Sequence, residues 1–70
     1  MYQENAKFKL SPRQWDILGG LAQGKSNKQI ANDFNISEAT VKMHVSALLR
    51  IFKAQNRVQI LLVAKEFGLV

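Results

Sequence analysis

The stretch from Ile36 to Phe52 constrains the fold most, because its apolar residues recur at the period of an α-helix. In a helix these residues align as one stripe, whose members are Val41, Val45, Leu48, Leu49 and Phe52. Ser37 has the side chain of an N-cap, and Ile36 can pack on Val41 as a hydrophobic staple. We therefore predict a helix over residues 38–52 with this stripe buried.

The opposite face of this predicted helix is polar and cationic. It carries Lys42, Met43, Ser46 and Arg50, with His44 at its flank. Glu38, the one acidic residue of the helix, lies in the first turn, where the helix dipole favours negative charge. We expect this face to stay exposed and to offer positive charge to a partner.

A shorter helix is predicted directly upstream, over residues 27–34. Ser26 and Gln29 have the spacing of a capping box, and Asn35 tolerates the left-handed conformation that often ends a helix. The apolar face consists of Ile30, Ala31 and Phe34. A short helix, a tight turn and a longer helix form a helix-turn-helix, whose second helix is narrow enough to enter the major groove of DNA.

Another helix is predicted near the N-terminus, over residues 12–23. Ser11 and Gln14 have the spacing of a capping box, although Gln14 also falls on the apolar side of the helix. Gly19 and Gly20 lie in the interior, where each costs about 1 kcal/mol relative to alanine unless another part of the chain approaches closely.

The last predicted helix covers residues 57–67, with Asn56 as its N-cap. Its apolar residues extend beyond one buried stripe, and the residues outside that stripe are Val58, Leu61 and Leu62. Either a small domain simply exposes these side chains, or a second copy covers them in a homodimer.

Together these elements predict an all-α fold, a four-helix bundle that contains a helix-turn-helix and occupies residues 10–70. Residues 1–9 are expected to be a polar lead-in or linker, from which Phe8 can tuck onto the domain.

The composition narrows the classes of function. Ten Lys and Arg against five Asp and Glu give a net charge of +5, which suits a polyanionic partner. The chain has no cysteine and one histidine, so it has few residues from which to build a metal site or a catalytic triad. An enzyme is the weakest option, because the sequence shows no paired carboxylates, no nucleophile–base pair and no phosphate-binding Gly loop. No apolar run approaches the about 18 residues of a membrane span, so the default expectation is a cytoplasmic protein without a membrane partner.

Five motifs, in order along the chain, resemble the LuxR/FixJ-type DNA-binding domain. They are LSPR at 10–13, LAQG at 21–24, SNKQIA at 26–31, ISEATVKMHV at 36–45 and NRVQ at 56–59, and the similarity covers about residues 10–69. The resemblance implies a four-helix domain that binds double-stranded DNA with its third helix in the major groove. It also implies dimerisation through the fourth helix, with no cofactor and no small-molecule ligand in this domain.

Carried over position by position, the resemblance implies DNA base contacts by Lys42, Met43 and Ser46. It implies DNA backbone contacts by Asn27, Lys28, Ser37, Thr40, His44, Arg50 and Arg57. Plainer interpretations remain open: Lys42 as a solvated lysine, Met43 as a partly buried residue at the edge of the core, and Ser46 as a small residue that only permits close approach.

The chain also departs from the family pattern. Gln14 stands where Glu is usual, which removes the acid of an internal ion pair, and Gly20 replaces an apolar residue. Asn35 and Lys53 stand where Gly is common, and Ile51 replaces a lysine that would contact the DNA backbone. None of these changes removes the cationic face.

We therefore expect a transcription regulator, or its C-terminal effector domain, that binds a two-fold symmetric DNA site as a homodimer, with RNA polymerase as a further candidate partner. Two alternatives use the same scaffold. A sigma-factor-like promoter reader is disfavoured by the apolar last helix, and a protein-interaction module would bind an acidic protein with the cationic face. Family members usually carry a receiver or sensor domain upstream, so we expect either a free-standing regulator or a C-terminal piece.

Overall fold

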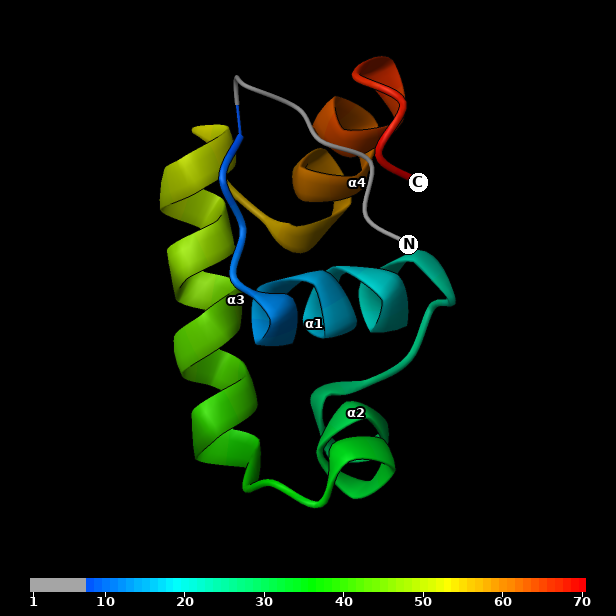
Figure 1. Ribbon diagram of the computed structural model, residues 1–70, viewed down its shortest axis with the longest axis vertical. Helices are drawn as coiled ribbons and strands as arrows, with labels where there is room; N and C mark the ends of the chain where they lie inside the picture. Colours follow the sequence, from blue (N-terminus) through cyan, green and yellow to red (C-terminus); the bar gives the residue numbers. More distant parts are fainter. Residues whose placement is uncertain (1–7) are drawn as a thin grey trace.

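Four α-helices follow one another in the computed structural model, which describes residues 8–70 (Figure 1). They are α1 Pro12–Ala22, α2 Asn27–Phe34, α3 Glu38–Phe52 and α4 Arg57–Glu66. The predicted all-α fold is confirmed, and α2 and α3 have the predicted bounds. Of the predicted lead-in, residues 1–7 lie outside the described residues.

Each helix begins at the polar cap that the sequence indicates, namely Ser11, Ser26, Ser37 and Asn56. In α1 the Ser11 hydroxyl oxygen accepts the Gln14 N–H at 3.1 Å, and the Gln14 side chain accepts the Ser11 N–H at 2.9 Å. The same reciprocal pair joins Ser26 and Gln29. The capping box thus gives the Gln14 amide a partner, although this side chain lies on the apolar side of the helix.

The helices end at residues in the left-handed conformation, which are Gly24, Asn35, Lys53 and Gly68. The N–H of the residue after each one donates to the carbonyl five positions earlier, as in the 3.1 Å bond from Lys25 to Gly20. Gln23 and Phe67, which precede the two glycines, already leave helical geometry with ψ angles of 1° and 8°. For this reason α1 and α4 end one residue earlier than predicted.

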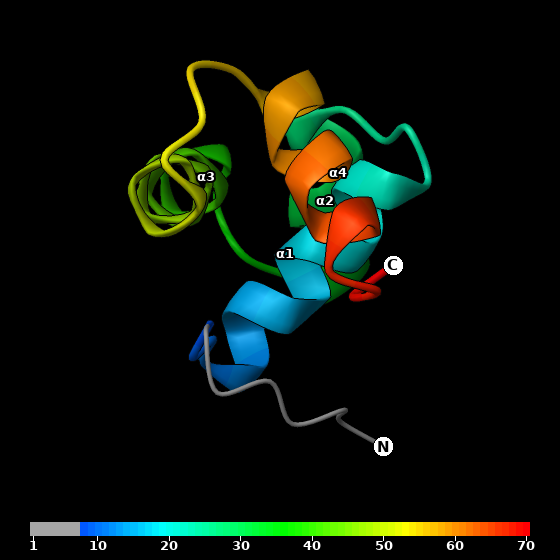
Figure 2. The same ribbon diagram turned by 90° about the horizontal axis from the view of Figure 1, so that it is seen from above.

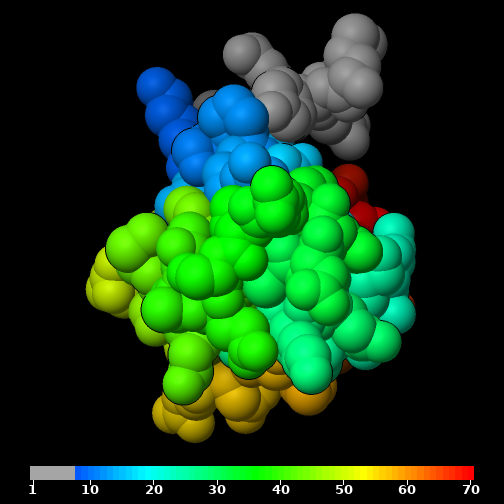
Figure 3. Space-filling model, turned by 90° about the horizontal axis from the view of Figure 1, so that it is seen from below, coloured from blue at the N-terminus to red at the C-terminus, as the bar shows by residue number. Residues whose placement is uncertain are grey.

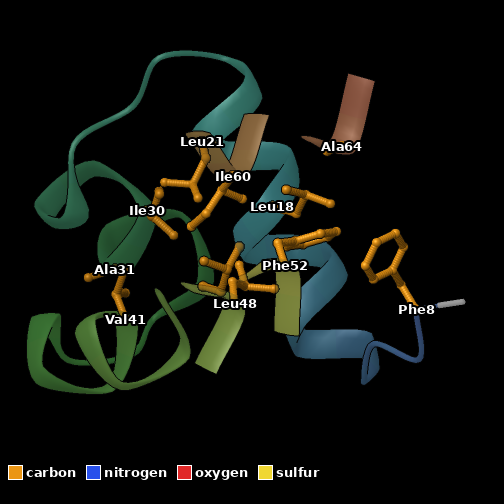
Figure 4. Packing of buried hydrophobic residues seen from close by; sticks show 11 residues of the cluster. Phe8, Leu18, Leu21, Ile30, Ala31, Val41, Leu48, Phe52, Ile60 and Ala64 are labelled. Carbon is orange, nitrogen blue, oxygen red and sulfur yellow. The ribbon is translucent and has the colours of Figure 1, made fainter. Parts of the chain in front are cut away.

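The other three helices all pack against α3. Buried residues from the four helices meet in one cluster (Figure 4), which contains Ile17, Leu18, Leu21, Ile30, Ala31, Val41, Leu48, Phe52, Ile60 and Ala64. Phe8 joins this cluster from outside the helices: its ring centroid lies 4.6 Å from that of Phe52 and 5.0 Å from that of Phe67. Phe8 therefore tucks onto the domain, as expected.

The two interior glycines of α1 have different surroundings. A Cβ atom on Gly20 would lie 2.7 Å from Cγ1 and 2.9 Å from Cδ1 of Ile30, closer than side chains tolerate. Gly20 thus lets Ile30 of α2 pack directly on the α1 backbone. A Cβ atom on Gly19 would meet nothing within 4 Å, so no close contact accounts for this glycine.

Candidate nucleic-acid interface

Helix α3 lies at one edge of the bundle, with α1, α2 and α4 all on the same side of it (Figures 1 and 2). Val41 and Leu48 on the inner side are completely buried. The outer side presents the predicted cationic face, with Lys42, Met43, Ser46 and Arg50 all exposed. A helix anchored along one side therefore leaves the other side free to contact a partner.

The exposure of Met43 distinguishes its two interpretations, as a residue that contacts DNA bases or as a partly buried residue at the edge of the core. Met43 is 61% exposed and does not belong to the buried cluster. This exposure disagrees with the interpretation of Met43 as a partly buried residue at the edge of the core. An exposed, flexible apolar side chain among polar neighbours is suited to apolar contact with a partner.

Thr40 and His44, which were also predicted to contact DNA, lie at the flank of the cationic face and are partly buried. At the start of α3, the Ser37 hydroxyl oxygen accepts the Thr40 N–H at 3.0 Å, and the two hydroxyl oxygens are 2.9 Å apart. Ser37 therefore caps the helix, and its hydroxyl group also contacts the side chain of Thr40.

The N-terminal end of α2 lies beside the first turns of α3 on one continuous surface (Figure 3). Asn27 is partly buried there, and Lys28 is exposed. Because the capping box occupies the N–H groups of Ser26 and Gln29, the N–H groups of Asn27 and Lys28 remain available to a ligand. Helix N-termini of this kind favour anions through their free N–H groups and the helix dipole.

Arg57, predicted as a DNA backbone contact, makes hydrogen bonds within the chain. Its Nη1 donates to Asn27 Oδ1 at 3.1 Å, and its Nη2 donates to the carbonyl oxygen of Lys25. The structure therefore brings together two residues, Arg57 and Asn27, to which the family resemblance gave separate contacts. The sequence carries no signal of this pairing, because the two residues are 30 positions apart.

Ion pairs neutralise two cations on the surface of the described residues. Asp16 pairs with Arg13 at 3.3 Å, and Asp33 pairs with Lys25. Among residues 8–70, the exposed cations Lys28, Lys42 and Arg50 make no ion pair. Unpaired positive charge therefore lies along α3 and at the start of α2, and also at Lys9, Lys53 and Lys65, which are exposed and make no ion pair within residues 8–70.

The predicted dimer contacts on α4 divide into two kinds. Val58 is 63% exposed and Leu62 is 61% exposed, and the two residues are one helical turn apart. Leu61 is partly buried and packs against the core. It also borders a groove of about 370 Å³, which is lined by Leu21, Gly24, Lys25, Ser26, Gln29, Arg57, Val58 and Leu61.

Two further features are absent from the described part of the chain. Residues 8–70 contain no group of three or more His, Cys, Asp or Glu residues that could hold a metal ion. None of the helices among these residues is long and apolar enough to cross a membrane.

Known proteins resemble this chain closely. The family described as "Bacterial regulatory proteins, luxR family" matches residues 9–64. The nitrate/nitrite response regulator protein NarP of Escherichia coli is 55% identical over 49 residues, which make up 70% of this chain and 23% of NarP. The glycerol metabolism activator of Pseudomonas putida is 49% identical over 55 residues, which make up 79% of this chain and 25% of that protein.

Among solved structures, the response regulator ChrA of a heme-sensing two-component system aligns with a TM-score of 0.84 and 35% identity. The alignment covers 97% of this chain and 33% of ChrA. The chain spans about a quarter of the length of the curated relatives that it matches. Because the family and these relatives are regulators, the expectation that the chain is not an enzyme is confirmed.

Proposed function

Because the chain belongs to the luxR family of bacterial regulatory proteins and is the DNA-binding domain of a transcription regulator, we propose that it inserts α3 into the major groove of DNA. Lys42, Met43 and Ser46 then face the base edges. One observation carries this proposal: these three side chains are exposed on a helix whose opposite side is anchored in the core.

The chemistry of the three side chains suits a groove. The ammonium group of Lys42 can donate to O6 and N7 of guanine, and the terminal methyl group of Met43 can contact the methyl group of thymine. The Ser46 hydroxyl group can donate or accept, and its small size permits close approach. Base contacts of this kind determine which sequence is bound.

Contacts to the DNA backbone are proposed around α3, from Asn27, Lys28, Ser37, Thr40, His44 and Arg50. Two observations support them: the free N–H groups at the start of α2, and the absence of ion pairs at Lys28 and Arg50 among residues 8–70. Such contacts fix the orientation of the protein on the duplex and make binding sensitive to salt.

We also propose that the chain binds DNA as a homodimer, in which Val58 and Leu62 of two copies pack together above the partly buried Leu61. The support is the exposure of two large apolar side chains on one face of α4. A two-fold symmetric dimer would bind two half-sites of a symmetric DNA sequence. The proposed place of action is the cytoplasm, and RNA polymerase is a further proposed partner because one relative is named an activator.

Titration of the chain against a labelled duplex that it has selected from a randomised pool tests the proposal. The logarithm of affinity should fall linearly with the logarithm of salt concentration, by about 0.9 for each phosphate contacted. Lys42→Ala should weaken binding and, if Lys42 touches a phosphate, reduce this slope by about 0.9.

A single strand of the same sequence is the control. Equal binding to the single strand and the duplex would contradict docking in a groove. Binding to an acidic protein without binding to the duplex would favour the protein-interaction alternative.

A further inference from the structure

The guanidinium group of Arg57 connects the first residue of α4 to the start of α2. It donates to two oxygen atoms, Oδ1 of Asn27 and the carbonyl oxygen of Lys25. Figure 3 shows the first turn of α4, in gold, at the edge of the surface formed by α2 and α3. A residue of the last helix therefore reaches the part of α2 that is proposed to contact DNA.

We propose that Arg57 is a positioning residue that orients Asn27 for its DNA backbone contact, in place of the direct phosphate contact implied by the family resemblance. This inference rests on the proposed function. A guanidinium group has only donors, so the oxygen of the Asn27 amide must face it. The Nδ2 group, at the other end of the amide, is then directed away from Arg57.

This orientation matches the chemistry of a phosphate. Phosphate oxygens accept hydrogen bonds, so they need the donor end of the amide, whereas the Oδ1 end would be repelled. Among residues 8–70 the Asn27 side chain makes no hydrogen bond other than the one with Arg57, which leaves both Nδ2 hydrogens available. Arg57 thus selects the one orientation of the amide in which Asn27 can bind a phosphate.

The surroundings of Arg57 hold its guanidinium group in place. Arg57 is partly buried, and the bond to the Lys25 carbonyl fixes the group against the turn between α1 and α2. The turn is itself held by the bond from the Lys25 N–H to Gly20 and by the ion pair of Lys25 with Asp33. Lys28, by contrast, is exposed and makes no ion pair within residues 8–70. Lys28 therefore serves as the comparison residue for Arg57 in the experiments below.

The salt dependence of duplex binding separates positioning from direct contact. Removal of the Arg57 guanidinium group leaves the Asn27 side chain free to rotate. The entropy lost when duplex binding immobilises this side chain should reduce affinity about fivefold. A neutral amide displaces no counterion, so Arg57→Ala should leave the salt slope within about 0.3 of that of the unmodified chain, whereas loss of a direct phosphate contact removes about 0.9. Lys28→Ala, the comparison variant, should lower the slope by about 0.9.

A double-mutant cycle provides a second readout. If Arg57 acts through Asn27, then Arg57→Ala should have no further effect in the Asn27→Ala background, whereas independent phosphate contacts would give losses that multiply. Arg57→Lys keeps the positive charge without the planar pair of donors, so it should lose affinity with an unchanged slope. Thermal unfolding shows whether each variant is folded. If Arg57→Ala does not fold, the affinity of Arg57→Lys provides the test in its place.

The possible results are distinct. A salt slope reduced by about 0.9 in Arg57→Ala, multiplicative losses in the cycle, or full affinity in Arg57→Lys would each overturn the positioning role while leaving DNA binding intact. Failure of the unmodified chain to bind the selected duplex would overturn the proposed function, and the positioning role with it.

Discussion

Alanine substitution of the two adjacent glycines in α1 should change stability in opposite directions. Gly19→Ala places its Cβ atom in open space, so only the gain in helix propensity remains, and the free energy of unfolding should rise by about 1 kcal/mol. For a domain of this size, that gain raises the midpoint of thermal unfolding by about 4–8 °C.

Gly20→Ala should be destabilising because its Cβ atom would lie 2.7 Å from Cγ1 of Ile30. Ile30 is completely buried, so it cannot move aside without disturbing the core. Overpacking of this kind costs about 1–3 kcal/mol, from which the propensity gain of about 1 kcal/mol must be subtracted. The two variants should therefore differ by about 1–3 kcal/mol in their free energy of unfolding.

Thermal and denaturant unfolding, followed by circular dichroism, measure this difference. Ile30→Val removes Cδ1, the atom that would lie 2.9 Å from the new Cβ, so it should reduce the penalty of Gly20→Ala. Displacement of Ile30 should also shift α2 and weaken duplex binding in Gly20→Ala, with no such loss in Gly19→Ala. Equal stabilisation by both substitutions would refute the explanation of Gly20 as a close-packing residue.

Three other substitutions test separate parts of the molecule. Met43→Ala should alter the preference among duplex sequences more than overall affinity, because Met43 is proposed to contact bases; equal losses on selected and random duplexes would count against this role. Leu62→Glu should abolish self-association in sedimentation, since it buries a charge in the proposed dimer interface; an unmodified chain that sediments as a monomer at every concentration would contradict the dimer. Lys53→Gly should stabilise the domain by about 1 kcal/mol in thermal unfolding, because Lys53 has a φ of 53°; a lower midpoint would show that the lysine side chain compensates for its backbone.

Much of the helical architecture follows from local sequence signals. Ser26 and Ser37 locate the starts of α2 and α3 because a cap requires only a few neighbouring residues. The exposure of Met43 also follows from the helical period, since it lies opposite Val41 and Leu48. Local patterns thus predicted both the helices and the face of α3 that stays exposed.

Contacts between distant segments could not be predicted in this way. The packing of Ile30 on Gly20 depends on how α2 crosses α1, and the bond from Arg57 to Asn27 depends on where α4 returns to the helix-turn-helix. The burial of Leu61 could not be predicted from local sequence either. Its position outside the main apolar stripe suggested exposure, yet it is partly buried against the core. Such contacts require the three-dimensional arrangement of the helices.

Methylation of the bound duplex by dimethyl sulfate tests the docking of α3 most directly. This reagent modifies guanine N7, which lies in the major groove, and adenine N3, which lies in the minor groove, so one experiment reports on both grooves. Docking of α3 predicts that the chain protects guanine N7 in the selected duplex and that Lys42→Ala removes protection at one guanine. Protection confined to adenine N3 in a saturated complex would contradict it.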